Sequence, residues 1–170
     1  MKILKFGGTS VGSVEALRNV KSIIEKEFNK DKPLIVVCSA LSGITNALLS
    51  ASQKALKQND FSEILKAAEE KHYQIISELL PRTAQTPLLM MVKVSFNEIE
   101  DVLFSVKNLG ELSDRIKDRL LSYGEQMSSK IVSAFLQSEG FPAVFQDSRK
   151  WIATDSHFGN GNVDSRKTNE

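Results

Sequence analysis

The chain has 170 residues and a nearly balanced charge, with 22 lysines and arginines against 21 aspartates and glutamates. Hydrophobic residues make up 41% of the sequence and aromatic residues 7%, a composition that fits one globular domain and excludes general disorder. The small net charge and the lack of a dense basic block argue against a nucleic-acid-binding protein.

Targeting signals and cysteines give a second set of exclusions. No apolar run approaches the roughly 20 residues that a membrane-spanning helix needs, so we expect no membrane association. The N-terminus has neither the long apolar stretch nor the small-residue cleavage site of a signal peptide. Cys38 is the single cysteine, and no histidine stands at metal-ligand spacing from it. We therefore expect a cytoplasmic, reducing compartment and no metal bound by the chain itself.

The first part of the chain reads as strand, helix and strand. Residues 2–6 predict a short strand that ends in a Gly7-Gly8 turn. Apolar residues recur at three- and four-residue intervals over residues 14–28, which predicts an amphipathic helix with Ser13 as its N-cap. Residues 34–38 are apolar and largely β-branched, which is typical of a strand buried on both faces. This order favours a parallel pair of strands.

Most of the remaining chain is expected to be helical. We expect helices over residues 47–56, 61–80, 88–106 and 114–139, followed by short strands over residues 143–145 and 151–153. Pro81 should end the second of these helices, and the last should break around Tyr123-Gly124. The pattern predicts an α/β fold with a helical excursion. Because such a sheet is small for this many helices, we also expect the chain to be part of a longer one.

Residues 5–12, with the sequence KFGGTSVG, could form an anion-binding loop. Glycines let the backbone approach a phosphate, free N–H groups would point at it, and Lys5 would add a positive charge. The dinucleotide fingerprint fails because Thr9 stands where it needs glycine, and the Walker pattern fails because Ser13-Val14 replaces its lysine and hydroxyl residue. An ordinary strand-to-helix turn with a surface lysine remains the alternative.

Residues 39–46, with the sequence SALSGITN, follow the second predicted strand. Open parallel sheets bind ligands at the carboxyl ends of their strands, so this loop and the glycine loop should face one crevice. The alternative is that Ser42, Thr45 and Asn46 only cap the next helix.

Two further places carry charged residues that could serve a site. Glu125 follows the expected helix break and could accept hydrogen bonds from a cationic ammonium group, or it could simply favour the helix dipole. Asp147 and Arg149 follow a predicted strand and would reach the same edge, or they could form an exposed salt bridge. His72 and His157 have no sequence partners for a metal site or a catalytic triad.

Taken together, these motifs resemble those of the aspartokinases, in the amino-acid kinase superfamily. The similar segments are residues 5–11, Ser39-Ala40, Gly43, Thr45-Asn46, Ser122, Gly124-Glu125, Ser128, Asp147, Arg149, Thr154-Asp155 and Phe158-Gly159. The resemblance runs from residue 2 to about residue 164 and is weak between residues 60 and 115. It implies a three-layer sandwich with a mainly parallel sheet, similar to carbamate kinase.

The resemblance also implies how the chain is organised. Residues 1–170 would be the N-terminal, amino-acid-substrate part of an aspartokinase catalytic domain, without the nucleotide-binding remainder and the regulatory ACT domains. We therefore expect little or no kinase activity from this chain alone and a homo-oligomer for the full-length protein.

The implied reaction is ATP-dependent phosphorylation of the β-carboxylate of L-aspartate, the first step toward lysine, threonine, methionine and isoleucine. An aspartate side chain has a pKa of about 3.9, so it is ionised at neutral pH and needs no general base. By motif, Lys5 would stabilise the transferred phosphoryl group, and Mg²⁺ would arrive with ATP. The residues implied to form the phosphate cradle are Gly7, Gly8, Thr9 and Ser10. Gly8 and Ser39 would also face the reacting groups, and Thr45 and Glu125 would bind aspartate.

Two alternatives stay open. One is another amino-acid kinase, such as one that acts on glutamate, although those enzymes have different opening loops. The other is a non-catalytic small-molecule-binding or regulatory module of the same fold.

Overall fold

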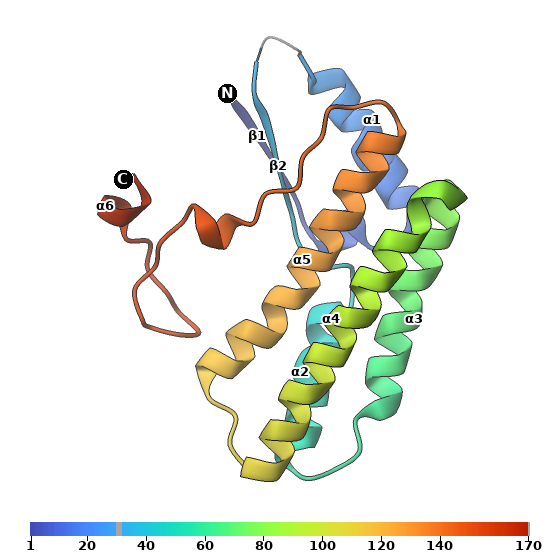
Figure 1. Cartoon of the computed structure of the whole chain (residues 1–170). Coiled ribbons are helices and arrows are strands. Elements are labelled where there is room, and N and C mark those ends of the chain that lie inside the picture. The colour runs from blue at the N-terminus through green and yellow to red at the C-terminus, as the bar shows by residue number, and fades with distance from the viewer. Residues whose placement is uncertain (30–31, 170) are drawn as a thin grey trace.

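A two-stranded parallel sheet and a bundle of long helices make up the computed structural model, which describes residues 1–29 and 32–169 (Figure 1). Strand β1 (Lys2–Phe6) pairs in register with β2 (Leu34–Cys38), so that Lys5 lies opposite Val37 and Phe6 opposite Cys38. Helix α1 (Val14–Glu27) connects the two strands. The predicted α/β class and both strand positions are confirmed.

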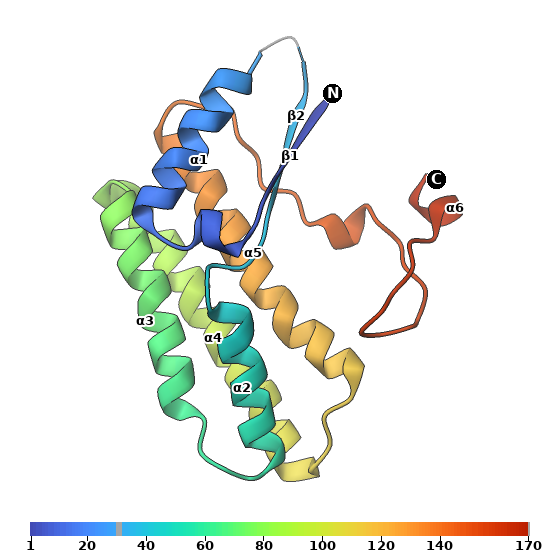
Figure 2. The same cartoon turned by 180° about the vertical axis from the view of Figure 1, so that it is seen from behind.

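Four helices form the bundle beside the sheet (Figure 2). They are α2 (Ile44–Leu56), α3 (Ser62–Leu79), α4 (Arg82–Leu109) and α5 (Asp114–Ser138). Helix α4 begins six residues before the expected start at residue 88 and contains Pro87 within its early turns. In the described part of the chain, no helix is both long and apolar enough to cross a bilayer.

Local capping explains where α1 begins. The Ser13 hydroxyl accepts a hydrogen bond from the Ala16 N–H at 3.2 Å, which satisfies one of the free donors of the first turn. The buried side chains Leu17, Val20 and Ile24 then share one face of the helix. The expected helix and its N-cap are both confirmed.

The expected break at Tyr123-Gly124 is wrong, because α5 runs without interruption through Gly124. A Cβ atom on Gly124 would lie 2.9 Å from the Ala40 Cβ and 3.3 Å from the Ile44 Cγ2. Glycine therefore serves close packing of α5 against the segment between β2 and α2, and the helix continues through it.

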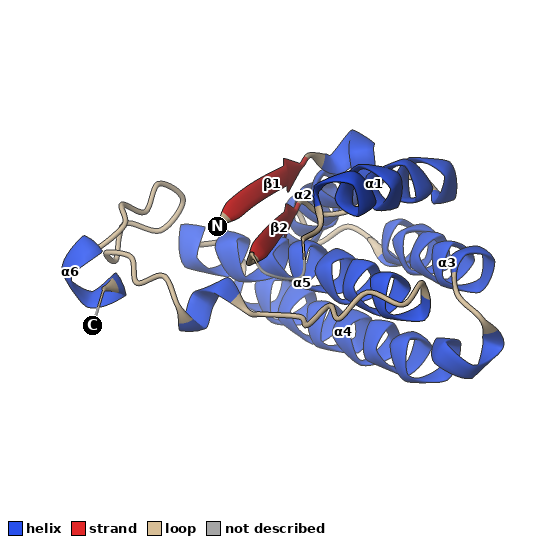
Figure 3. Cartoon of the chain, turned by 90° about the horizontal axis from the view of Figure 1, so that it is seen from above, coloured by secondary structure: helices blue, strands red, loops and turns tan. Residues whose placement is uncertain are grey.

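The third and fourth strands expected over residues 143–145 and 151–153 are also wrong for the described residues, where the sheet contains only β1 and β2 (Figure 3). Exposure does alternate over residues 141–147, but this segment packs on α5 without joining a ladder. The Gln137 side chain donates to the Ala143 carbonyl at 2.6 Å, and the Lys130 ammonium lies over the Phe145 ring.

After this segment come two short helical turns, η2 (Ser148–Lys150) and α6 (Ser165–Thr168). Between them, Thr154 forms an isolated bridge with Val163. A strand needs a row of backbone partners, and a single bridge does not provide one.

The expectation that β2 is buried on both faces is wrong as well. One face carries Leu34, Val36 and Cys38, which pack against the core. On the other face, Ile35 is 43% exposed and Val37 is 44% exposed, and Ile3 of β1 is 58% exposed beside them. Only one face of the sheet is covered by the elements that the structure describes.

Candidate functional site

The loops that follow β1 and β2 lie against each other. The Ser39 N–H donates to the Phe6 carbonyl at 3.1 Å, which extends the strand pairing by one step. After β1, the first of these loops contains a short helical turn, η1 (Gly8–Val11). A Cβ atom on Gly8 would lie 3.3 Å from the Ala40 carbonyl oxygen and 3.8 Å from the Ser39 Oγ. Glycine thus lets the first loop pack directly on the second.

A second close contact joins the far ends of the same loops. A Cβ atom on Gly12 would lie only 2.5 Å from the Ser42 Cβ and 3.0 Å from the Gly8 carbonyl oxygen. Real Cβ atoms are not found at such a separation, so any larger residue at position 12 would push the loops apart. The glycines of the first loop therefore determine how the second loop is placed.

Helix α5 brings the third sequence motif to this point. Gly124 packs on Ala40 and Ile44, as described above, and the buried Ser128 hydroxyl donates to the Ser39 carbonyl at 2.6 Å. The structure therefore brings together the three segments singled out in the sequence, namely residues 5–12, 39–46 and 122–129.

The predicted phosphate-binding residues lie on the first of these segments. Lys5 is exposed near the end of β1, and Thr9 and Ser10 lie in η1. Gly7 is exposed, and a Cβ atom there would have no neighbour within 4 Å, so its backbone is open to approach. Gly8 faces the second loop.

The predicted aspartate-binding residues lie on two helices that touch. Thr45 is in the first turn of α2, next to the Ile44 side chain that contacts Gly124, and Glu125 follows Gly124 in α5. Both are half-buried. In residues 1–29 and 32–169, neither the Glu125 carboxylate nor the Lys5 ammonium has an intramolecular hydrogen bond or ion pair. Two charges of the predicted site are therefore not neutralised by neighbours that the structure describes.

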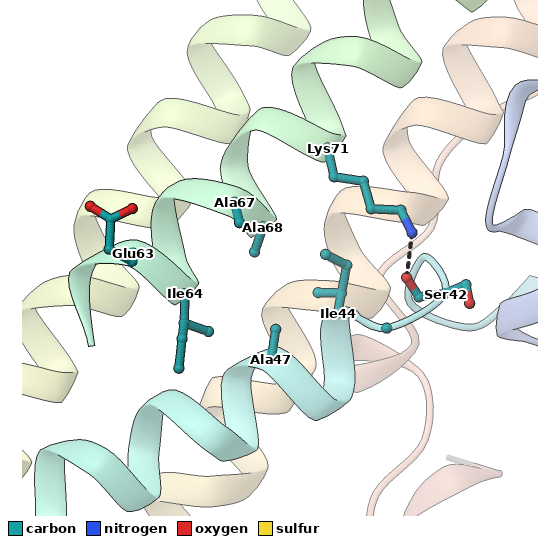
Figure 4. Close-up of a pocket in the computed structure, with 9 residues that line it drawn as sticks. Ser42, Ile44, Ala47, Glu63, Ile64, Ala67, Ala68 and Lys71 are labelled. Atoms are coloured by element: carbon teal, nitrogen blue, oxygen red, sulfur yellow. Dashed lines mark hydrogen bonds between the residues drawn. The ribbon is translucent and has the colours of Figure 1, made fainter. Parts of the chain in front are cut away.

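Sequence reasoning missed Lys71. This residue of α3 donates from Nζ to the Ser42 carbonyl at 2.6 Å, as the dashed line in Figure 4 shows. It borders a groove of about 460 Å³ between α2 and α3, whose lining also includes Ile44, Ala47, Ile64 and Ala68. The sequence could have pointed to Lys71 by its spacing. It stands three residues after the buried Ala68 and four before the buried Ile75, which places it on the inward side of an amphipathic helix.

Asp147 and Arg149 form a salt bridge, which was one of the two arrangements expected from the sequence. An Arg149 nitrogen lies 2.6 Å from Asp147 Oδ2 and also donates to the Gln126 side chain at 2.9 Å. Hydrogen bonds from Arg149 lower the pKa of Asp147 to about 2. Through its hydrogen bond to Gln126, Arg149 joins the C-terminal segment to α5 one residue after Glu125.

Cys38 is not an activated thiol, and the described residues contain no metal-binding cluster. Burial raises the pKa of the Cys38 thiol to about 11, so it stays protonated at neutral pH. In the part of the chain that the structure describes, no group of three or more histidine, cysteine, aspartate and glutamate side chains could hold a metal ion.

Comparison with known proteins identifies the family. The model of the amino acid kinase family matches residues 1–170. The chain is 33% identical over 165 residues to aspartokinase 1, chloroplastic, of Arabidopsis thaliana, covering 95% of this chain and 28% of that protein. It is 28% identical over 169 residues to the aspartokinase of Candida albicans, covering 96% of this chain and 31% of that protein.

A solved structure agrees with these relatives. E. coli aspartokinase III in complex with aspartate and ADP has a TM-score of 0.86 and 24% identity, and the match covers 99% of this chain and 36% of that one. The likeness shows the same fold, and the chain spans well under half of each relative. The family match over the whole sequence and the shared fold lead to one conclusion: the chain belongs to the amino acid kinase family.

Proposed function

We propose that this chain is the N-terminal, amino-acid-substrate part of an aspartokinase catalytic domain, and that the whole protein phosphorylates L-aspartate with ATP. The names of the relatives and the solved complex of E. coli aspartokinase III with aspartate and ADP support this proposal. The observation that carries it is the meeting of three motif segments, where the Lys5 ammonium and the Glu125 carboxylate have no intramolecular partner among the described residues.

In the proposed reaction, a β-carboxylate oxygen of aspartate forms a bond to the γ-phosphorus of ATP. The bond between that phosphorus and the bridging oxygen of ADP breaks, and the products are 4-phospho-L-aspartate and ADP. The attacking carboxylate is already ionised, so the main task of the protein is to hold two anions together. Charge neutralisation and positioning then carry the catalysis, as in other phosphoryl transfers.

The first loop suits the phosphate side of this reaction. Lys5 would neutralise charge on the transferred phosphoryl group, and the open backbone at Gly7 would let phosphate oxygens approach N–H groups. Gly8, Thr9 and Ser10 would complete the cradle. Mg²⁺ bound to ATP would supply further positive charge at the phosphates.

The second and third segments suit the amino-acid side. The half-buried Glu125 carboxylate would accept hydrogen bonds from the substrate ammonium, and Thr45 would bind the substrate from the first turn of α2. Ser39 would face the reacting groups, held by the hydrogen bond from Ser128 to its carbonyl.

The cellular setting is part of the same proposal. The product would feed the synthesis of lysine, threonine, methionine and isoleucine, and the whole protein would be a homo-oligomer. The names of the relatives support an aspartokinase, and the single cysteine suits a reducing cytoplasm.

Aspartyl-hydroxamate formation that depends on ATP and Mg²⁺ tests the proposal. It should be measured for the longest reading frame that contains this chain, for its Lys5→Ala variant and for this chain alone. We expect activity in the first, a loss of at least about 100-fold in the second and little or none in the third. Lys26→Ala, which removes an exposed lysine of α1, is the matched control.

A folded full-length protein that forms no aspartyl-hydroxamate would overturn the substrate assignment. Product from glutamate instead would indicate another amino-acid kinase, and binding of a small molecule without turnover would indicate a regulatory module.

A further inference from the structure

We propose that Lys71 is a positioning residue of the substrate loop, residues 39–43, so this inference rests on the proposed function. Lys71 lies on α3, outside all three motif segments, and its Nζ donates to the Ser42 carbonyl at 2.6 Å (Figure 4). No other hydrogen bond or ion pair of this ammonium occurs in the described residues, so its polar contact is with the loop.

The loop is held at both ends by side chains from different helices. Ser128 of α5 donates to the Ser39 carbonyl at 2.6 Å, and Lys71 donates to the Ser42 carbonyl at the same distance. Among the described residues, no backbone N–H donates to either of these two carbonyls, although the carbonyls of Leu41 and Gly43 do accept backbone hydrogen bonds. Two side-chain donors therefore fix the path of the backbone from the end of β2 to the start of α2.

The end of the loop that Lys71 holds leads directly into the first turn of α2, which contains Thr45. Gly43, the N-cap of α2, has a φ of 82° and makes no side-chain capping bond, so the helix start lacks the usual polar anchor. The Ser42–Gly43 peptide sets the direction in which α2 leaves the loop. Lys71 holds the carbonyl of that peptide and so places the first turn of α2, which contains Thr45.

Ser42, whose carbonyl Lys71 holds, also packs against residues 5–12, the predicted phosphate-binding loop. Ser42 packs against Gly12 so closely that a Cβ atom there would lie 2.5 Å from the Ser42 Cβ. A shift of Ser42 would therefore move the end of the loop that contains Gly7 and Gly8. Lys71 acts on both halves of the site through one carbonyl.

The charge of Lys71 also suits an anionic substrate. Helix dipoles place positive partial charge at the N-terminus, so a lysine beside the start of α2 adds to a potential that already favours anions. A lysine with a purely stabilising role would be better placed at the C-terminus of a helix. An anion bound near the start of α2 would therefore be stabilised both by the helix and by Lys71.

The test compares Lys71→Met, Lys71→Arg and the control Lys66→Met in the longest reading frame that contains this chain. Lys66 is an exposed lysine of the same helix without a partner among the described residues. Steady-state kinetics give KM for aspartate and kcat, and hydrogen exchange follows the amides of residues 39–46.

We expect Lys71→Met to raise KM for aspartate roughly tenfold and to speed exchange in residues 39–46. Lys71→Arg should restore most of the affinity, and Lys66→Met should behave as the wild type. A merely structural role would lower Tm and the active fraction, and hence the apparent kcat, while leaving KM and local exchange unchanged. That result would overturn the proposal.

Failure of the proposed function is separable from failure of this inference. If the wild type forms no aspartyl-hydroxamate, the kinase assignment falls and hydrogen exchange decides alone. Faster exchange confined to residues 39–46 in Lys71→Met would still support the positioning role, and unchanged exchange would overturn it.

Discussion

Glu125 is the residue whose role can be separated most cleanly from folding. Its carboxylate is half-buried and has no hydrogen bond or ion pair with residues that the structure describes. A neutral amide of the same shape should therefore cost little stability. It should weaken the contact with a substrate ammonium, because the amide carries no negative charge to attract the positive one.

We predict that Glu125→Gln raises KM for aspartate by roughly 10-fold or more in the full-length protein, with a Tm close to that of the wild type. Steady-state kinetics and thermal unfolding measure the two quantities. Glu139→Gln, at the end of α5, is the control with an exposed glutamate. An unchanged KM would remove Glu125 from the site.

Gly124 is a residue where local propensity and tertiary packing conflict. Alanine is better than glycine in a helix by about 1 kcal/mol, but its Cβ would lie 2.9 Å from the Ala40 Cβ, which cannot move without the backbone. Overpacking of this kind costs about 1–3 kcal/mol.

We therefore predict that Gly124→Ala lowers the free energy of unfolding by up to about 2 kcal/mol, which is the overpacking cost less the gain in helix propensity. Urea unfolding gives this value, with Ser133→Ala on the same helix as a control that should change little. A more stable Gly124→Ala variant would mean that α5 and the loop after β2 are not in tight contact.

At the scale of elements, α3 and α4 enclose a histidine that affects the pH dependence of stability. His72 is fully buried, its Nδ1 lies 2.7 Å from the Ala68 carbonyl, and its ring meets Phe96 edge to face. Within the described residues, Nε2 has no hydrogen-bond partner. Burial lowers the pKa of His72 below its usual 6.5.

The lowered pKa means that the unfolded chain takes up a proton near pH 6.5 while the folded chain does not. Stability should therefore fall as pH decreases from 7.5 to 5.5, because the unfolded state binds more protons in this range. We predict a smaller decrease in His72→Phe and an unchanged one in His157→Asn, which alters an exposed histidine. Urea unfolding at both pH values is the measurement, and equal decreases in all three proteins would contradict the assignment.

Local sequence patterns predicted the elements that depend on local forces. The strands at residues 2–6 and 34–38 and the helix capped by Ser13 follow from periodicity, turns and capping. The close approach of residues 5–12 and 39–46 was predicted from the rule that the loops at the carboxyl ends of parallel strands face one crevice.

Contacts between distant segments account for what the sequence did not predict. Glycine in a helical pattern indicates either a break or a close contact, and only the packing of Gly124 on Ala40 decides between them. The contact of Lys71 with Ser42 depends on how α3 lies against α2. Residues 143–145 alternate in exposure like a strand, but in the described part of the chain they do not pair with either strand of the sheet. The roles of Lys5, Gly8, Ser39, Thr45 and Glu125 stay predictions.

For the whole molecule, the candidate site lies where two structural units meet. β1, β2 and their loops form one unit, and the bundle of α2 to α5 forms the other (Figure 1). Hydrogen bonds from α3 and α5 to Ser42 and Ser39 join them. The site therefore depends on the docking of the sheet onto the bundle as much as on its own residues.

The uncovered face of the sheet also affects how the isolated chain behaves at high concentration. Ile3, Ile35 and Val37 form an apolar strip on a short parallel sheet, which is the kind of surface that promotes intermolecular strand association. We predict that Ile35→Thr combined with Val37→Thr reduces light scattering by this chain at high concentration, because threonine keeps the strand preference while removing apolar surface.

Val36→Thr on the covered face should instead lower Tm, and equal scattering by the double variant and the wild type would contradict the prediction. We therefore expect contact between these strips, rather than unfolding, to limit how much of this polypeptide can be kept in solution when it is produced by itself.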